Sequence, residues 1–137
     1  MEETREPLIE ADEVTALHDD IIRRFGGRIG ILSRPLLESA LSRPFISLAD
    51  GTSPYPTLIE KAAVLFEGMV KNHAFVDGNK RTAAIAVSEF MRRKQVPLEF
   101  SDEEIEDLCI RTASGEMNSG EILEWFRRHV RNPRGRS

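Results

Sequence analysis

The most informative part of this sequence is residues 73–82, which read HAFVDGNKRT. Apolar side chains recur at helical spacing on both sides of it, so the stretch predicts a loop that joins a helix over 58–72 to a helix over 79–94. The middle of the second helix, residues 83–87, is apolar on nearly every side. That pattern predicts a helix buried at the centre of the fold, with the loop leading directly into it.

The residues around the start of this second helix suit a bound anion. A helix that begins at Asn79 or Lys80 presents unpaired backbone N–H groups and the positive end of its dipole. Gly78 lets the backbone approach an anion closely, and Lys80 and Arg81 add positive charge at the same place. Asp77 offers the kind of oxygen ligand that Mg²⁺ prefers beside phosphate oxygens.

A histidine completes a set of residues that phosphoryl or nucleotidyl transfer requires. His73 can accept a proton from an attacking hydroxyl at neutral pH, and Phe75, between polar neighbours, is expected to point inward and anchor the loop. Each feature also has an ordinary structural interpretation, such as a turn at Asp-Gly-Asn or a solvated Lys-Arg pair. However, the two positive side chains stand at the positive end of the helix dipole, which is unfavourable, and a bound anion would offset this repulsion.

The remaining sequence predicts further helices and no strand, and therefore an all-α fold, a compact bundle of about six helices. Ser33, Thr57 and Ser101 are expected to be N-caps, the last two within capping boxes. The helices are predicted over residues 12–25, 34–42, 58–72, 79–94, 102–113 and 121–130. Residues 44–56, rich in proline, are predicted to form an irregular flap before the central helix pair. His18 is expected to be a packed or surface side chain, not a catalytic one.

Composition limits the classes of protein that this chain can represent. Its 137 residues fit a single domain, 1–137, with loose tails expected at 1–7 and 132–137. The net charge of −4 argues against nucleic acid as a partner. One cysteine, Cys109, allows no internal disulfide, which favours a reducing, cytoplasmic location. The longest apolar runs are five residues, too short to cross a membrane, and no signal peptide is expected.

The central stretch resembles a known motif. Residues 73–81 look like the Fic motif, histidine-x-phenylalanine-x-acid-glycine-asparagine-x-arginine, and the continuation through Thr82 and Ala83 resembles the death-on-curing (Doc) branch of the Fic/Doc superfamily. The resemblance covers nearly the whole chain. It includes residues 17–31, 37–44, 61–63 and 113–116 and Trp125. The Fic/Doc fold that it implies is all-α, in agreement with the helical pattern.

The resemblance implies a role for each residue of the motif. His73 would be the general base on a target hydroxyl, Asp77 would hold Mg²⁺, and Arg81 would bind phosphate in the transition state. The nucleotide-binding set implied by the family is Gly78, Asn79, Lys80 and Arg81. The implied cofactors are ATP and Mg²⁺.

Two positions decide which reaction the resemblance favours. The adenylylating branch of the family usually has glycine where Lys80 stands, and an arginine where Ala84 stands. This chain has neither that glycine nor that arginine, and in this it resembles the Doc branch. The activity of the Doc branch is phosphorylation of a threonine of elongation factor Tu. The chain is therefore expected to be a toxin kinase of a type II toxin–antitoxin pair. Protein adenylyl transfer (AMP or another nucleotide) and a non-catalytic nucleotide-binding module are the alternatives.

Two partners follow from this interpretation. Thr112-x-x-x-Glu116 superficially resembles the inhibitory motif of self-inhibited Fic proteins, but Met117 breaks the pattern. A separate antitoxin that folds on binding is therefore expected. The second partner is the protein target, and the flap together with the motif loop is expected to form its docking groove, with Ile46 and Tyr55 as contacts.

Overall fold

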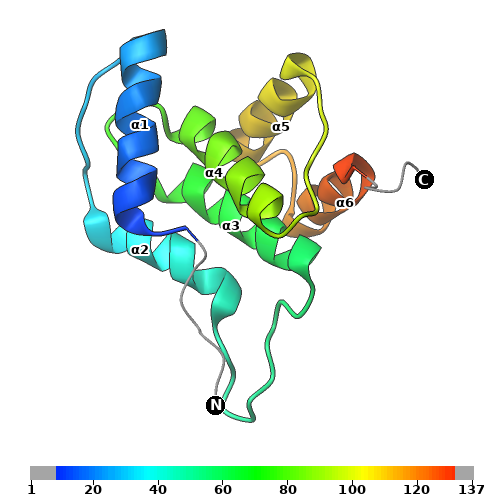
Figure 1. The fold of residues 1–137 in the computed structure, drawn as a ribbon. Coiled ribbons are helices and arrows are strands. Elements are labelled where there is room, and N and C mark those ends of the chain that lie inside the picture. The colour runs from blue at the N-terminus through cyan, green and yellow to red at the C-terminus, as the bar shows by residue number, and fades with distance from the viewer. Residues whose placement is uncertain (1–8, 132–137) are drawn as a thin grey trace.

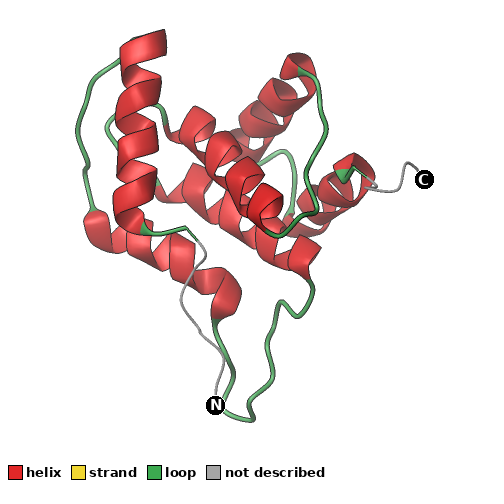
Figure 2. Cartoon of the chain, viewed as in Figure 1, coloured by secondary structure: helices red, strands yellow, loops and turns green. Residues whose placement is uncertain are grey.

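The computed structural model describes residues 9–131 and contains six α-helices (Figure 1). Their bounds are α1 Ala11–Phe25, α2 Arg34–Ser42, α3 Leu58–Asn72, α4 Asn79–Arg93, α5 Asp102–Ser114 and α6 Ser119–His129. The described part of the chain has no strand and pairs extended backbone only at two isolated bridges, Ile31 with Phe75 and Leu98 with Val130 (Figure 2). The predicted all-α fold is confirmed. The expected tails at 1–7 and 132–137 lie outside the described residues.

Capping side chains explain where most of the helices begin. Ser33, Thr57 and Ser101 each accept a hydrogen bond from the backbone N–H three residues later, as predicted. Asn118 does the same for α6 and completes a capping box with Glu121. The last helix therefore begins at Ser119, two residues before the predicted start at residue 121.

The core lies around α3 and α4, which pack against each other and hold the other helices on their outer sides (Figure 1). Phe66 on α3 contacts Phe126 on α6, with ring centroids 5.7 Å apart, and both are fully buried. The prediction that α4 is buried on nearly every side is only partly right. Ala83, Ala86 and Val87 are buried, but Ile85 is 39% exposed.

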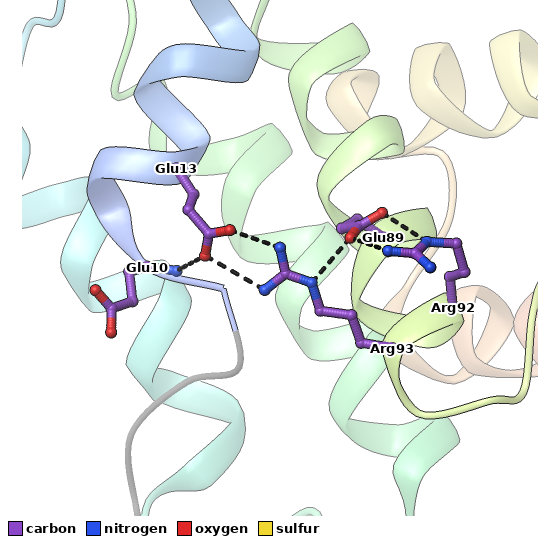
Figure 3. A network of polar contacts seen from close by, with 5 residues as sticks. All are labelled: Glu10, Glu13, Glu89, Arg92 and Arg93. Atoms are coloured by element: carbon purple, nitrogen blue, oxygen red, sulfur yellow. Dashed lines mark hydrogen bonds and ion pairs between the residues drawn. The ribbon is translucent and has the colours of Figure 1, made fainter.

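A network of charged side chains ties α1 to α4 (Figure 3). Arg93 at the end of α4 binds Glu13 of α1 at 2.5 Å and Glu89 of its own helix at 2.8 Å, and Arg92 also binds Glu89. These hydrogen bonds to the two arginines lower the pKa of Glu89 to about 2. The first helix is thus fixed to the end of α4 opposite the motif.

The flap, residues 44–56, joins α2 to α3. The chain leaves α2 through a 3₁₀ turn, η1 (Arg43–Phe45), and the rest of the flap has neither helix nor strand, as predicted. Pro44 lies inside this turn, so α2 already ends at Ser42. Among the described residues, no helix combines the length and apolar character that crossing a membrane requires.

Candidate active site

The motif loop, residues 73–78, connects the end of α3 to the start of α4. His73 caps α3 in the left-handed conformation, with φ 51° and ψ 51°, and its side chain is exposed. This conformation reverses the chain at the end of the helix, as a glycine commonly does. The imidazole is therefore presented to solvent at the point where the motif loop begins.

Phe75 and Asn79 hold the motif loop in its conformation. Phe75 is 2% exposed, and its ring lies in the core. The Asn79 side chain accepts a hydrogen bond from the Phe75 backbone N–H at 3.0 Å and donates one to the Phe75 carbonyl at 2.9 Å. One of the two N–H bonds of its amide group is occupied in this way, so Asn79 can offer a bound anion its backbone N–H and the second side-chain N–H.

A second segment, the glycine loop (residues 26–31), lies along the motif loop. Leu32 and Ser33 donate backbone hydrogen bonds to the carbonyl of Ala74, and Val76 donates one to the carbonyl of Gly30. Gly30 has a φ of 148°, and a Cβ added there would lie 3.1 Å from the Val76 side chain. The close approach of the two loops therefore requires glycine at this position.

Asp77 projects from the motif loop toward the glycine loop. Its Oδ2 accepts a hydrogen bond from the Arg28 backbone N–H at 2.9 Å, and its other oxygen, Oδ1, has no hydrogen-bond donor within residues 9–131. The described residues contain no group of three metal-ligating side chains. One exposed carboxylate beside a helix N-terminus fits the way Mg²⁺ is bound together with substrate phosphates, which supply the other ligands.

The start of α4 has the features of an anion site. Gly78 is its N-cap in a left-handed conformation (φ 78°), and no side chain caps the helix there. The first backbone N–H groups of a helix have no partner within it, so those of residues 79–81 are available to a ligand. Lys80 and Arg81 are exposed beside them, and the Arg81 guanidinium lies 4.4 Å above the Phe25 ring.

Behind the anion site, α5 packs against the start of α4. The Cys109 thiol on α5 donates a long hydrogen bond to the Lys80 carbonyl, with a sulfur–oxygen distance of 3.6 Å. The cysteine is 6% exposed, and burial raises the pKa of its thiol to about 11. The cysteine therefore supports the first turn of α4 as a neutral side chain.

Sequence reasoning missed the part that His18 plays at this site. His18 on α1 is 1% exposed, and its Nε2 lies 2.6 Å from the Asp77 carbonyl oxygen. The expectation of a packed side chain is met, but the packing is against the motif loop itself. No local signal could reveal this, because His18 and Asp77 are 59 residues apart.

The structure does not bring the predicted docking residues to the motif loop. Tyr55 precedes α3 and His73 follows it, and a 15-residue helix is about 22 Å long. Phe45 at the start of the flap packs on Phe90, near the end of α4, whereas the motif loop leads into its beginning. Figure 1 shows the flap and the motif loop at opposite ends of α3. A groove formed jointly by the two loops is therefore not supported.

The two docking residues themselves differ in their surroundings. Ile46 is 43% exposed, and Tyr55 is half-buried. The Tyr55 hydroxyl accepts a hydrogen bond from Arg43 at 3.3 Å, and its carbonyl accepts one from Lys61. Tyr55 thus fixes the flap to α3.

The site is separate from the hollow between α1 and α2. That hollow of about 390 Å³ is lined by charged residues that include Asp12, Arg34 and Glu38, and it contains no residue of the motif. His73, Asp77, Lys80 and Arg81 are all exposed to solvent.

The helical fold agrees with the comparison to known proteins. The chain belongs to the Fic/DOC family, whose sequence pattern matches residues 8–91. A relative named Toxin Doc, from Mycolicibacterium smegmatis, is 39% identical over 92 residues, which cover 66% of this chain and 70% of the relative. Protein kinase doc from Escherichia phage P1 is 32% identical over 120 residues, 88% of this chain and 93% of the relative. Both relatives carry the Doc name, so the predicted Doc branch is confirmed.

Proposed function

We propose that this chain is the toxin of a type II toxin–antitoxin pair and a protein kinase that transfers the γ-phosphate of ATP to a threonine. The target we propose is a cytoplasmic translation factor such as elongation factor Tu. The observation that carries the proposal is that four exposed residues of chemical use, His73, Asp77, Lys80 and Arg81, lie in the loop and first turn that begin α4, a helix start that no side chain caps. The relative named as a protein kinase, aligned over most of both chains, supports the same activity.

Each residue has one task in the proposed reaction. The target hydroxyl oxygen attacks the γ-phosphorus, the bond from that phosphorus to the β-phosphate oxygen breaks, and ADP leaves. His73 accepts the hydroxyl proton. The backbone N–H groups of residues 79–81, with Lys80 and Arg81, stabilise the charge that develops on the phosphate oxygens. Asp77 would hold Mg²⁺, which neutralises phosphate charge when bound.

The distribution of charge along α4 favours transfer of the γ-phosphate over transfer of AMP. Lys80 and Arg81 stand in the first turn, while Ala84, one turn further, is uncharged and half-buried. The cations therefore act on one end of a triphosphate only. We infer that this end is the reacting γ-phosphate, held near Arg81 and Asp77.

The experiment that tests this function compares ATP labelled at the α- or the γ-phosphate. Purified protein is incubated with Mg²⁺, elongation factor Tu and each labelled nucleotide in turn. Label transferred from the γ-position alone is the expected result. Label from the α-position would establish nucleotidyl transfer and overturn the kinase assignment. Label from neither position, with ATP still bound, would favour a non-catalytic module.

We also propose that a separate antitoxin binds near the site. Four large apolar side chains in or beside the glycine loop are exposed: Phe25 at 58%, Ile29 at 62%, Ile31 at 40% and Leu32 at 66%. Exposed apolar groups of this kind mark surfaces that bind other proteins. Expression of the chain alone in bacteria is expected to stop growth. Co-expression with the protein encoded beside it is expected to restore growth, and toxicity that no neighbouring protein suppresses would contradict the proposal.

A further inference from the structure

The ring of His18 is enclosed between α1 and the motif loop. It stacks on the Phe75 ring with the centroids 3.9 Å apart and the planes 10° from parallel. A Cβ added to Gly78 would lie 3.6 Å from His18 and 3.2 Å from Ile22, so α1 is pressed directly against the backbone at this glycine. The imidazole therefore contacts both the anchor of the motif loop and the N-cap of α4.

The polar contact of this ring is directed at a single atom. A carbonyl oxygen can only accept, so the 2.6 Å contact between His18 Nε2 and the Asp77 oxygen requires a hydrogen on Nε2. The same peptide bond continues into Gly78, the N-cap of α4. On its other side, the Asp77 carboxylate is held by the Arg28 N–H. Two segments far from the motif in sequence thus fix the backbone and the side chain of Asp77.

The other nitrogen of the ring, Nδ1, is a buried polar atom without a hydrogen-bond partner among the described residues. The nearest charged atom, Oδ1 of Asp19, is 3.6 Å away. A phenylalanine or leucine would fill the same space without leaving a buried polar atom unpaired. The histidine is therefore explained by its Nε2 hydrogen bond rather than by packing.

We propose that His18 is a positioning residue of the phosphotransfer site, where its Nε2–H holds the Asp77–Gly78 peptide in place. This fixes the Asp77 carboxylate and the start of α4 toward a common point, where phosphate and Mg²⁺ would be bound. The inference rests on the proposed function. His18 itself does not touch the substrate.

The test uses two substitutions of nearly equal shape, His18→Gln and His18→Met. Both remove the aromatic ring, but only glutamine can donate a hydrogen bond close to the position of Nε2. Amide hydrogen exchange is measured in the nucleotide-free protein at Phe75, Val76 and Thr82, whose backbone N–H groups are hydrogen-bonded on either side of the Asp77–Gly78 peptide. The kcat, the KM for ATP and the thermal midpoint are measured next. In His18→Met we expect exchange to rise about tenfold, the size expected for one hydrogen bond. We expect kcat to fall roughly 10- to 100-fold, as for a displaced catalytic group.

His18→Gln is expected to recover most of the exchange protection and of kcat, although both variants lose the same stacking. His129→Met is the matched control, because His129 also stacks on an aromatic ring, that of Trp125 at 3.8 Å, and contacts a carbonyl oxygen at 2.7 Å. It lies on α6, away from the motif. It should lower the thermal midpoint and leave kcat and the exchange of Phe75, Val76 and Thr82 unchanged.

Two results would overturn the inference: wild-type exchange at Phe75, Val76 and Thr82 in His18→Met, or equal loss of exchange protection in His18→Met and His18→Gln. If His18→Met does not fold, His18→Phe replaces it, because phenylalanine keeps the stacking and lacks the donor. Hydrogen exchange requires no turnover. A wild-type protein that transfers no phosphate would therefore contradict the proposed function, while the exchange data still decide whether His18 holds the loop.

Discussion

At the level of single residues, His73 combines a strained backbone with the reactive side chain. The left-handed region costs a residue with a Cβ about 1–2 kcal/mol relative to glycine, and His73 adopts it at φ 51°. Nothing in the capping of α3 requires a histidine, because glycine is the usual residue at this position. Helix capping therefore does not explain the imidazole, which supports the proposed role of His73 as general base.

His73→Gly is expected to raise stability and remove activity. Glycine relieves the strain at φ 51°, which should raise the free energy of unfolding by up to about 1 kcal/mol. Loss of the general base should lower phosphate transfer roughly 10²- to 10⁴-fold. Urea unfolding and the γ-label assay measure the two effects, and undiminished transfer would contradict the role of His73.

Lys80→Ala should reduce transfer without unfolding the protein, because Lys80 is exposed at the start of α4. The loss of one donor to developing negative charge costs about 2.7–4 kcal/mol, or roughly 10²- to 10³-fold in kcat. Lys71→Ala is the control, since Lys71 is also exposed and pairs with Glu67 on α3. Equal losses in the two variants would show a general effect of charge.

At the level of elements, the contact between the glycine loop and the motif loop sets the site geometry. Gly30→Ala places a methyl group 3.1 Å from the Val76 side chain at a φ of 148°. We expect it to cost about 1–3 kcal/mol of stability and to abolish transfer. Gly51→Ala is the matched control, because Gly51 also has a positive φ (89°) but an added Cβ meets nothing within 4 Å. It should lose stability and keep activity.

The network that joins α1 to α4 makes stability depend on pH in the acid range. The folded-state pKa of Glu89 is about 2, below its ordinary 4.5, because Arg92 and Arg93 bind the carboxylate. Its contribution is therefore fully present above pH 4.5 and is lost as the pH falls toward 2. The charges are partly exposed, so we expect roughly 1 kcal/mol from them.

Urea unfolding of the wild type and of Glu89→Gln between pH 6 and pH 2 measures this contribution. The difference between the two proteins should be largest near pH 6 and should disappear toward pH 2. Glu103→Gln, on α5 and outside the network, serves as the control. A difference that stays constant with pH would show that the carboxylate is not held by the arginines.

At the level of the whole molecule, local patterns predicted most of the helices and the motif. Ser33, Thr57 and Ser101 act on backbone groups three residues away, so their sequence spacing suffices. Asn118 and Glu121 have the same capping-box spacing, but the apolar periodicity behind the predicted helix over 121–130 begins only at Ile122, so the predicted start is two residues late.

Long-range contacts could not be predicted in this way. Arg28 binds Asp77 across 49 residues and His18 binds it across 59, and no spacing rule relates such positions. The placement of the flap also depends on the packing of helices. Because α2 and α3 hold it at the end of α3 away from His73, a flap close to the motif in sequence is remote from it in space.

The rate at which a thiol reagent modifies Cys109 can report how often α5 separates from the start of α4. Its thiol lies between α5 and the carbonyl of Lys80, and its raised pKa of about 11 leaves almost no thiolate at neutral pH. A thiol reagent should therefore react only when α5 separates from the start of α4. Ligands that order this turn, ATP above all, should slow the reaction, so the single cysteine is an internal probe that requires no added label.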